Sequence, residues 1–157
     1  MRTASILVTV VLVFSTVSQA HAWDERGHRV IALIANHYLE APVRKQVEAM
    51  LTADEDPLAL HDIAGAATWA DRYRDSATPE HDKSTTNWHF AAIYANRPNI
   101  PEACFGQVPL PAGTPASKGS GYACIIDKID QFRAELSNPS TDAAERLLAL
   151  KYLLHLV

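Results

Sequence analysis

Apolar residues recur along most of the chain with helical spacing, and polar or proline-rich stretches separate the apolar segments. The first predicted helix of the mature region covers about residues 27–39 and is apolar almost all round, which is typical of a buried helix. One of its faces carries four residues at helical spacing: His28, Ile31, Ala35 and Leu39. A second helix is expected after Ala41, with Pro42 in its first turn. Four apolar residues of this second helix are expected to point inward: Val43, Val47, Met50 and Leu51.

A third helix is predicted over about residues 60–73, after the polar break "TADEDP". One stripe along it carries mostly small residues: Ala64, Ala67, Thr68, Asp71 and Arg74. Small side chains let another segment approach closely, and Asp71 and Arg74 are neighbours because they lie three residues apart.

The middle of the chain combines a short aromatic segment with a long stretch rich in proline and glycine. "NWHFAAIY" (87–94) is short and aromatic and is expected to be extended, and residues 95–122 are expected to form a long loop because they are rich in proline and glycine. A helix over about 124–136 should follow, with four residues inward: Ile125, Ile129, Phe132 and Leu136. Asn138-Pro139 should end it, and Asp142 with Glu145 resembles a capping box for a last helix. No strand pattern is sustained, so the predicted fold class is all-α.

The first 22 residues have the features of a signal peptide: Arg2, the apolar run "ILVTVVLVF" and the cleavage site Ala20-His21-Ala22. The alternative is an uncleaved N-terminal anchor. Cleavage would leave residues 23–157 as part of one secreted or periplasmic domain. Arg2 is the only charged side chain removed, so the net charge of −4 becomes −5. Such an acidic chain lacks the basic patch of most nucleic-acid-binding proteins, and any positive charge for phosphates would have to come from bound metal ions.

Export also bears on Cys104 and Cys124, the two cysteines of the chain. In an oxidising compartment they are expected to form a disulfide, and the alternative is two free thiols. The disulfide would close a loop of about 20 residues, which corresponds to roughly 3 kcal/mol in the chain-entropy model.

The last helix remains strongly apolar as far as Val157 and shows no glycine or polar cap. We interpret this ending as a helix cut in its middle. The alternative is a true C-terminus that docks on the core.

Five residues are candidate metal ligands: Trp23, His28, Asp71, His89 and His155. Cleavage before Trp23 would free an α-amine with an ordinary pKa of about 8, which can give up its proton to a metal at modest cost. The alternative for each histidine is a hydrogen-bonded core residue, and the alternative for Asp71 is an ion pair with Arg72 or Arg74. His155 lies in a leucine-rich helix, where burial is costly unless the imidazole is hydrogen-bonded or binds a metal.

Four motifs follow one another along residues 23–157: Trp23 with His28, "ATWAD" (67–71), "WHF" (88–90) and "LKYLLHLV" (150–157). In this combination and order they resemble the family of secreted single-strand-specific zinc nucleases, whose type members are the fungal nucleases P-one and S-one. The zinc phospholipases C of bacteria are more distant relatives with the same multi-helix, all-α fold. The resemblance implies this fold, incomplete in this chain.

The resemblance further implies three zinc ions. Trp23, by its amine and carbonyl, and His28 match ligands of one ion, and three residues match ligands of a second: Asp71, His89 and His155. The family's bridging Asp and the ligands of its third zinc have no counterpart before Val157.

Arg74 matches a basic residue that contacts phosphate in the family. Ala91 and Ala92 stand where the family often has an acidic residue for the nucleobase, so the resemblance does not give the base preference of this chain. Trp88 and Phe90 are candidate stacking groups for bases, although core packing is the expectation for both.

The resemblance implies a zinc-dependent hydrolase that cleaves single-stranded DNA and RNA to 5′-phosphate products, with 3′-nucleotidase activity in many members. The expected partners are nucleic acids and nucleotides, no protein partner is implied, and a monomer is the default. The alternatives are a phospholipase C-like phosphodiesterase and a non-catalytic zinc-binding helical fragment. Residues 23–157 alone are expected to be inactive, because ligands of the third ion are missing.

Overall fold

The computed structural model describes residues 24–76, 83–96, 98–104, 110–119, 121 and 123–157. The predicted signal peptide and Trp23 lie outside these residues. Within them the chain forms α-helices and short 3-10 helices and no strand, which confirms the all-α prediction.

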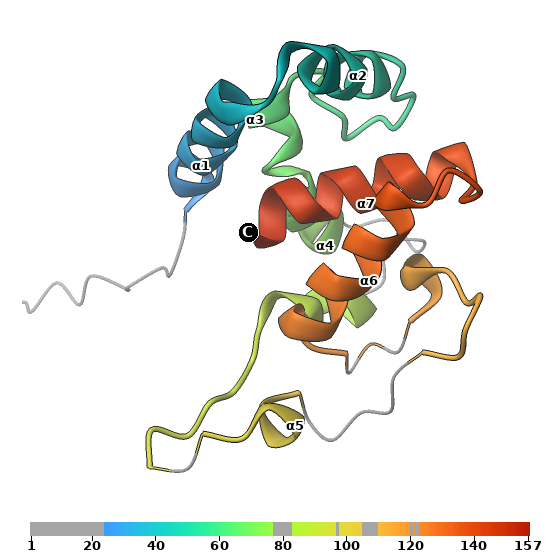
Figure 1. Cartoon of the computed structure of the whole chain (residues 1–157). Helices are drawn as coiled ribbons and strands as arrows, with labels where there is room; N and C mark the ends of the chain where they lie inside the picture. The colour runs from blue at the N-terminus through green and yellow to red at the C-terminus, as the bar shows by residue number, and fades with distance from the viewer. Residues whose placement is uncertain (1–23, 77–82, 97, 105–109, 120, 122) are drawn as a thin grey trace, which may run out of the picture.

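Nine helical elements follow one another in the described residues (Figure 1). They are α1 (Glu25–Tyr38), α2 (Ala41–Thr52), α3 (Ile63–Ala66), α4 (Trp69–Asp75), η1 (Lys83–His89), α5 (Ile100–Ala103), η2 (Ala116–Lys118), α6 (Ile125–Ser137) and α7 (Ala143–Leu156). The helix α7 crosses the middle of the fold and contacts α1, α3, α4 and α6. Residues far apart in the sequence therefore meet along α7.

Two apolar clusters pack against α7, one on each side. The first is aromatic and includes Trp69, Trp88, Phe132 and Tyr152. The rings of Phe132 and Tyr152 stack at a centroid distance of 4.6 Å. The second is aliphatic and joins Leu150 and Leu154 of α7 to residues of α1, α2 and α3. Burial of these side chains stabilises the crossing of the helices, at roughly 25 cal/mol for each Å² of apolar surface removed from water.

The prediction that the first helix is buried all round is wrong. Only Ala32 of α1 is buried, and Val30, Leu33 and Ile34 are each about half exposed. The helix packs mainly on α3 and α7, and its opposite apolar side stays half exposed. Val43 of α2 is also exposed rather than inward, whereas Val47, Met50 and Leu51 pack into the aliphatic cluster as predicted.

The helix predicted over residues 60–73 is two short helices, α3 and α4. The break falls at Thr68, whose hydroxyl donates to the carbonyl of Gly65 at 2.8 Å. A side chain that bonds to the backbone in this way competes with the regular helical hydrogen bonds, which accounts for the break. The small residues do permit close approach, because His155 of α7 reaches the carbonyl of Ala67.

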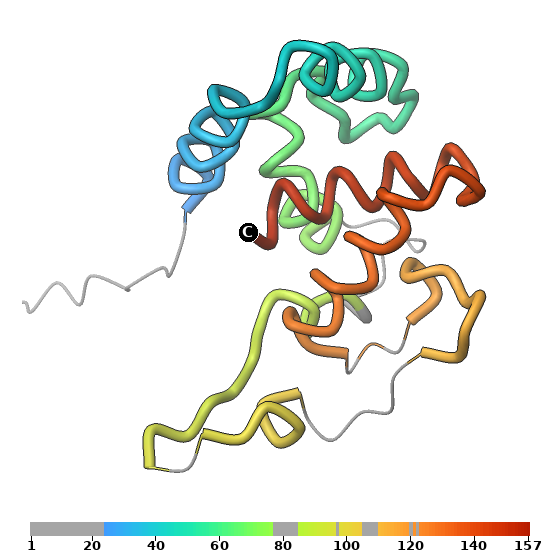
Figure 2. Tube along the Cα trace, in the orientation of Figure 1, coloured from blue at the N-terminus to red at the C-terminus, as the bar shows by residue number. Residues whose placement is uncertain are grey.

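The segment predicted to be extended at 87–94 is helical at its start, because residues 87–89 close the 3-10 helix η1. Residues 90–94 then leave the helical body with no regular structure (Figure 2). The expected loop at 95–122 contains the short helices α5 and η2. The disulfide prediction is confirmed, since Cys104 and Cys124 are joined with an S–S distance of 2.01 Å. It ties α5 to the start of α6.

The helices α6 and α7 begin and end close to their predicted bounds. Phe132 of α6 is fully buried, and Ile125, Ile129 and Leu136 pack beside it as predicted. Asp142 caps α7 by accepting a hydrogen bond from the backbone amide of Ala144 at 2.8 Å. The capping box is only half formed, because the Glu145 carboxylate instead accepts a hydrogen bond from the Ser117 hydroxyl.

Candidate metal centre

The first contributor to the site is α1, which carries His28 one turn from its N-terminus. Asp24 sets the start of the helix, because its carboxylate accepts a hydrogen bond from the amide of Gly27 at 2.9 Å. The ring of His28 stacks on that of His155, with centroids 4.0 Å apart and planes inclined by 22°. The start of α1 therefore lies against the end of α7.

The second contributor is α4, which carries Asp71 and Arg74. The guanidinium of Arg74 donates to Oδ1 of Asp71 at 2.8 Å, as expected for residues three apart on a helix. Arg74 also makes two hydrogen bonds to the carboxylate of Asp75, at 2.8 and 3.0 Å. These contacts raise the pKa of Arg74, with the Asp75 hydrogen bond as the largest cause, so the guanidinium is a permanent cation beside the site.

The third contributor is η1, which carries His89. Its Nδ1 lies 3.0 Å from the carbonyl oxygen of Thr85. The imidazole is almost fully buried because the neighbouring Trp88 anchors this segment in the aromatic cluster. Its Nε2 has no hydrogen-bond partner and lies 3.7 Å from Oδ1 of Asp71.

The fourth contributor is α7, which carries His155 in a fully packed environment, 3% exposed. Its Nδ1 lies 2.8 Å from the carbonyl oxygen of Ala67, and its Nε2 lies 3.6 Å from Oδ1 of Asp71. The rings of His89 and His155 meet edge to face at a centroid distance of 4.9 Å. Asp71 is thus faced by two imidazoles from segments far apart in the sequence.

The protonation of these imidazoles follows from their partners. A carbonyl oxygen can only accept a hydrogen bond, so Nδ1 of both His89 and His155 must carry the proton and donate. The lone pair is then on Nε2, the atom that faces Asp71. Burial lowers the pKa of His89, and burial together with the charge of His28 lowers the pKa of His155 to about 4. Both imidazoles are therefore neutral at pH 7, the form that binds metals.

This arrangement fits a divalent metal ion. The donor atoms of His28, Asp71 and His155 all lie within 4.8 Å of one another, and the unpaired Nε2 of His89 lies beside them. Imidazole nitrogen and carboxylate oxygen are a common zinc donor set. Histidines that ligate metals typically donate their other ring nitrogen to a carbonyl or carboxylate, as His89 and His155 do here.

The comparison with known families agrees with the site's composition. The family model described as S1/P1 Nuclease matches residues 23–157. The chain belongs to the S1/P1 nuclease family. A search of curated proteins found no match. Because S1/P1 nucleases are zinc enzymes that act on nucleic acids, the S1/P1 match is consistent with the gathering of histidines around Asp71.

The remaining sequence predictions about the S1/P1 site concern the N-terminal Trp23 and the aromatic residues Trp88 and Phe90. Trp23 lies outside the described residues, so the structure does not place it. Phe90 was expected to pack in the core and does not, because its side chain is 54% exposed directly after the buried His89. Trp88, by contrast, is buried in the aromatic cluster as expected.

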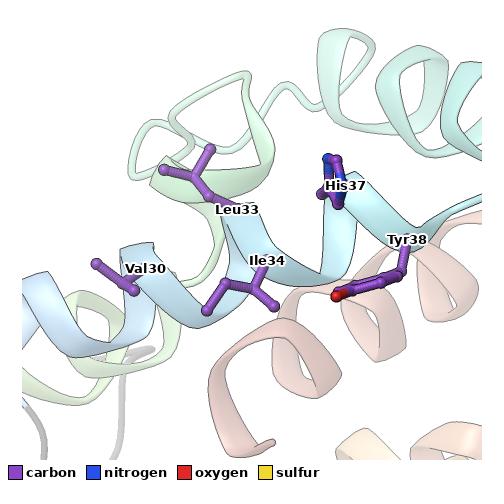
Figure 3. A pocket seen from close by; sticks show the side chains of 5 residues that line it. All are labelled: Val30, Leu33, Ile34, His37 and Tyr38. Carbon is purple, nitrogen blue, oxygen red and sulfur yellow. The ribbon is translucent and has the colours of Figure 1, made fainter.

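Two other features of this S1/P1 nuclease lie apart from the site. Cys104, Cys124 and Asp127 also group within ligand distance, but the disulfide occupies both sulfurs, so this group does not suit a metal. A shallow hollow of about 480 Å³ lies along α1 (Figure 3). It is lined by Val30, Leu33, Ile34, His37 and Tyr38 and contains none of the predicted ligands.

In the described part of the chain, no helix has the length and apolar character to cross a membrane.

Proposed function

We propose that this S1/P1 nuclease is an exported, zinc-dependent phosphodiesterase that hydrolyses single-stranded DNA and RNA and leaves 5′-phosphates, with 3′-nucleotidase activity as a further reaction. The observation that carries the proposal is the convergence of two neutral imidazole nitrogens on one carboxylate oxygen. Nε2 of His89 and Nε2 of His155 lie 3.7 and 3.6 Å from Oδ1 of Asp71. Without a cation this geometry leaves the buried Nε2 of His89 unsatisfied, which is energetically costly.

The proposed assignment of ligands follows the elements that supply them. Asp71, His89 and His155 would hold one zinc ion, and His28 with the amine and carbonyl of Trp23 would hold a second. The stacking of His28 on His155 supports two neighbouring ions rather than two remote ones. Bound zinc supplies Lewis acidity and lowers the pKa of a coordinated water to about 7.

The chain's own residues would act on the substrate around this centre. Arg74 would neutralise a phosphoryl oxygen, because its guanidinium is partly exposed and always charged. The exposed ring of Phe90, whose centroid lies 6.3 Å from that of His89, would stack on a nucleobase. Stacking requires an unpaired base, which favours single strands over duplexes.

The test uses the complete gene product after removal of the signal peptide, and residues 23–157 alone serve as the comparison that is expected to be inactive. Single-stranded DNA, duplex DNA and a phosphatidylcholine emulsion are assayed side by side, with and without a chelator. We expect chelator-sensitive cleavage of the single strand. Lipid cleavage without nuclease activity would favour a phospholipase C-like enzyme, and the absence of both would favour a non-catalytic zinc-binding protein.

A matched pair of variants links the activity to the site. His155→Gln should abolish cleavage and reduce zinc content. His61→Gln is the control, because Nδ1 of His61 also bonds a backbone carbonyl, that of Leu51 at 3.1 Å, but in the segment between α2 and α3. Equal effects of the two variants would argue against the assigned metal centre.

A further inference from the structure

We infer that a buried ion cluster of Lys151, Asp54 and Asp56 is a positioning device that keeps the ligand-bearing helices α4 and α7 in register. The inference rests on the proposed zinc site. It adds residues that touch neither zinc nor substrate but act through Asp71 and His155.

The cluster centres on Lys151 of α7, which is 4% exposed. Its Nζ donates to Oδ2 of Asp54 at 2.9 Å and to Oδ2 of Asp56 at 3.1 Å. Both carboxylates belong to the polar segment that follows α2. The ammonium group of α7 therefore binds a segment almost a hundred residues away in sequence.

Trp69 connects the same cluster to α4. Its indole Nε1 donates to Oδ2 of Asp56 at 2.8 Å, and its ring lies under Nζ of Lys151 at 4.0 Å from the centroid. Oδ2 of Asp56 thus accepts two hydrogen bonds, one from Lys151 of α7 and one from Trp69 of α4. A cation over an indole ring adds an attraction of its own.

The acidic segment is itself held in a fixed shape. Oδ1 of Asp54 accepts from the amide of Asp56, and Oδ1 of Asp56 accepts from the amide of Leu58 at 2.8 Å. Burial acts to raise the pKa of Asp56, but the hydrogen bonds from Leu58, Lys151 and Trp69 outweigh it and lower this pKa. Asp56 is therefore ionised at neutral pH.

The position of the cluster relative to the ligands gives it a role. Lys151 precedes His155 by four residues, one helical turn on the same face of α7, and Trp69 precedes Asp71 by two residues on α4. The helix α7 is thus bound at two levels: to α4 through the ion cluster and Trp69, and to the junction between α3 and α4 through the contact of His155 with the Ala67 carbonyl. Contacts at two levels fix both the distance between α4 and α7 and their relative rotation. These two quantities set how Asp71 and His155 face each other.

A purely stabilising role explains the cluster poorly. Removing two carboxylates and an ammonium from water is costly, and apolar residues of similar volume often give equal or greater stability. The rest of α7 uses leucine and alanine for that purpose. Directional bonds to charged groups specify one arrangement of the helices, and a metal site needs its ligands placed to within a fraction of an ångström.

The test separates positioning from folding. Lys151→Met alone would leave the buried carboxylate of Asp54 and the partly exposed carboxylate of Asp56 uncompensated, so the main variant combines Lys151→Met with Asp54→Asn and Asp56→Asn. This triple variant removes the charges and keeps oxygen acceptors for the backbone amides. Zinc affinity is measured by competition with a chromogenic chelator, and thermal unfolding is measured on the metal-free protein.

We expect the triple variant to bind zinc at least about tenfold more weakly, as is typical when residues that orient metal ligands are changed, with a melting temperature near that of the wild type. Leu51→Ala is the control, because it opens a cavity in the aliphatic core, keeps the backbone carbonyl that contacts Asp54 and leaves the three charged side chains unchanged. It should lower the melting temperature but not the zinc affinity.

Wild-type zinc affinity in the triple variant would overturn the inference. A loss of affinity that Leu51→Ala reproduces at the same loss of melting temperature would also overturn it, because the cluster would then be only structural. If the wild-type protein binds no zinc, the proposed function itself fails.

Discussion

Nε2 of His155 lies 3.6 Å from Oδ1 of Asp71, because the end of α7 packs against the short helix α4. The gap is too long for a hydrogen bond and suits two ligands that share a small cation. Oδ1 of Asp71 also accepts from Arg74 at 2.8 Å, so one carboxylate oxygen faces both the proposed metal ligands and the proposed phosphate-binding residue.

The carboxylate of Asp71 gives the first prediction. Asp71→Asn keeps the shape of the side chain and removes its charge, so the zinc dissociation constant should rise more than about tenfold, as measured by chelator competition. Asp75→Asn is the matched control, because Asp75 also binds Arg74 but lies outside the group of ligand atoms. Equal losses of zinc affinity in the two variants would contradict the assignment of Asp71.

The second prediction concerns the mature N-terminus. Adding one residue ahead of Trp23 turns its amine into a peptide amide, which has no lone pair for a metal, and should lower the zinc content of the purified protein by about one ion, as measured by elemental analysis. Replacing Trp23 with Phe, without any extension, is the control, because it keeps both backbone donor atoms. An extended protein with unchanged zinc content and turnover would exclude the terminal amine as a ligand.

Arg74 gives the third prediction. Arg74→Gln should lower kcat on single-stranded DNA by about a hundredfold, as is typical when one donor to a developing charge is removed, while zinc binding stays close to that of the wild type. Arg72→Gln is the control on the same helix, because Arg72 donates instead to the carbonyl of Gly65. A change in KM alone would indicate that Arg74 binds the substrate without favouring the transition state.

The fourth prediction is a pH dependence that involves no metal ligand. Lys128 is fully buried, donates to the carbonyl of Ala116 at 2.7 Å and lies over the ring of Trp88. Burial lowers the pKa of Lys128 from 10.5 to about 8. Between pH 8 and 10.5 the unfolded chain therefore holds the proton that the folded chain has lost, so the free energy of unfolding rises with pH.

The measurement for Lys128 compares the metal-free wild type with Lys128→Met by denaturant unfolding at pH 7.5 and pH 10. The wild type should gain on the order of 3 kcal/mol relative to the variant across the full interval. Other groups titrate equally in both proteins and cancel in the difference. A difference that does not vary with pH would show that Lys128 keeps an ordinary pKa.

The sequence predicts the long helices well, whereas the metal ligands that it proposes remain a prediction. The helices α1, α2, α6 and α7 follow from apolar periodicity and, for α7, from the local cap Asp142, all of which depend on near neighbours. The grouping of His28, Asp71, His89 and His155 came from motifs, and the structure places these four side chains together.

The features that the sequence did not predict depend on contacts between distant segments. The carbonyls of Ala67 and Thr85 orient the histidines, and backbone acceptors leave no trace in residue types. Lys151 is a single lysine between leucines and a tyrosine in the sequence, and its carboxylate partners are almost a hundred residues away. The break between α3 and α4 depends on the rotamer of Thr68, which no periodicity reports.

The half-exposed side chains on the outer side of α1 have a practical consequence at the bench. Val30, Leu33 and Ile34 form an exposed apolar surface on the helix that also carries His28. At high protein concentration, exposed apolar surface of this kind favours association between molecules. Light scattering, measured before and after a mild detergent is added, should accompany each measurement of zinc affinity. It shows whether a signal comes from association between molecules or from binding of zinc.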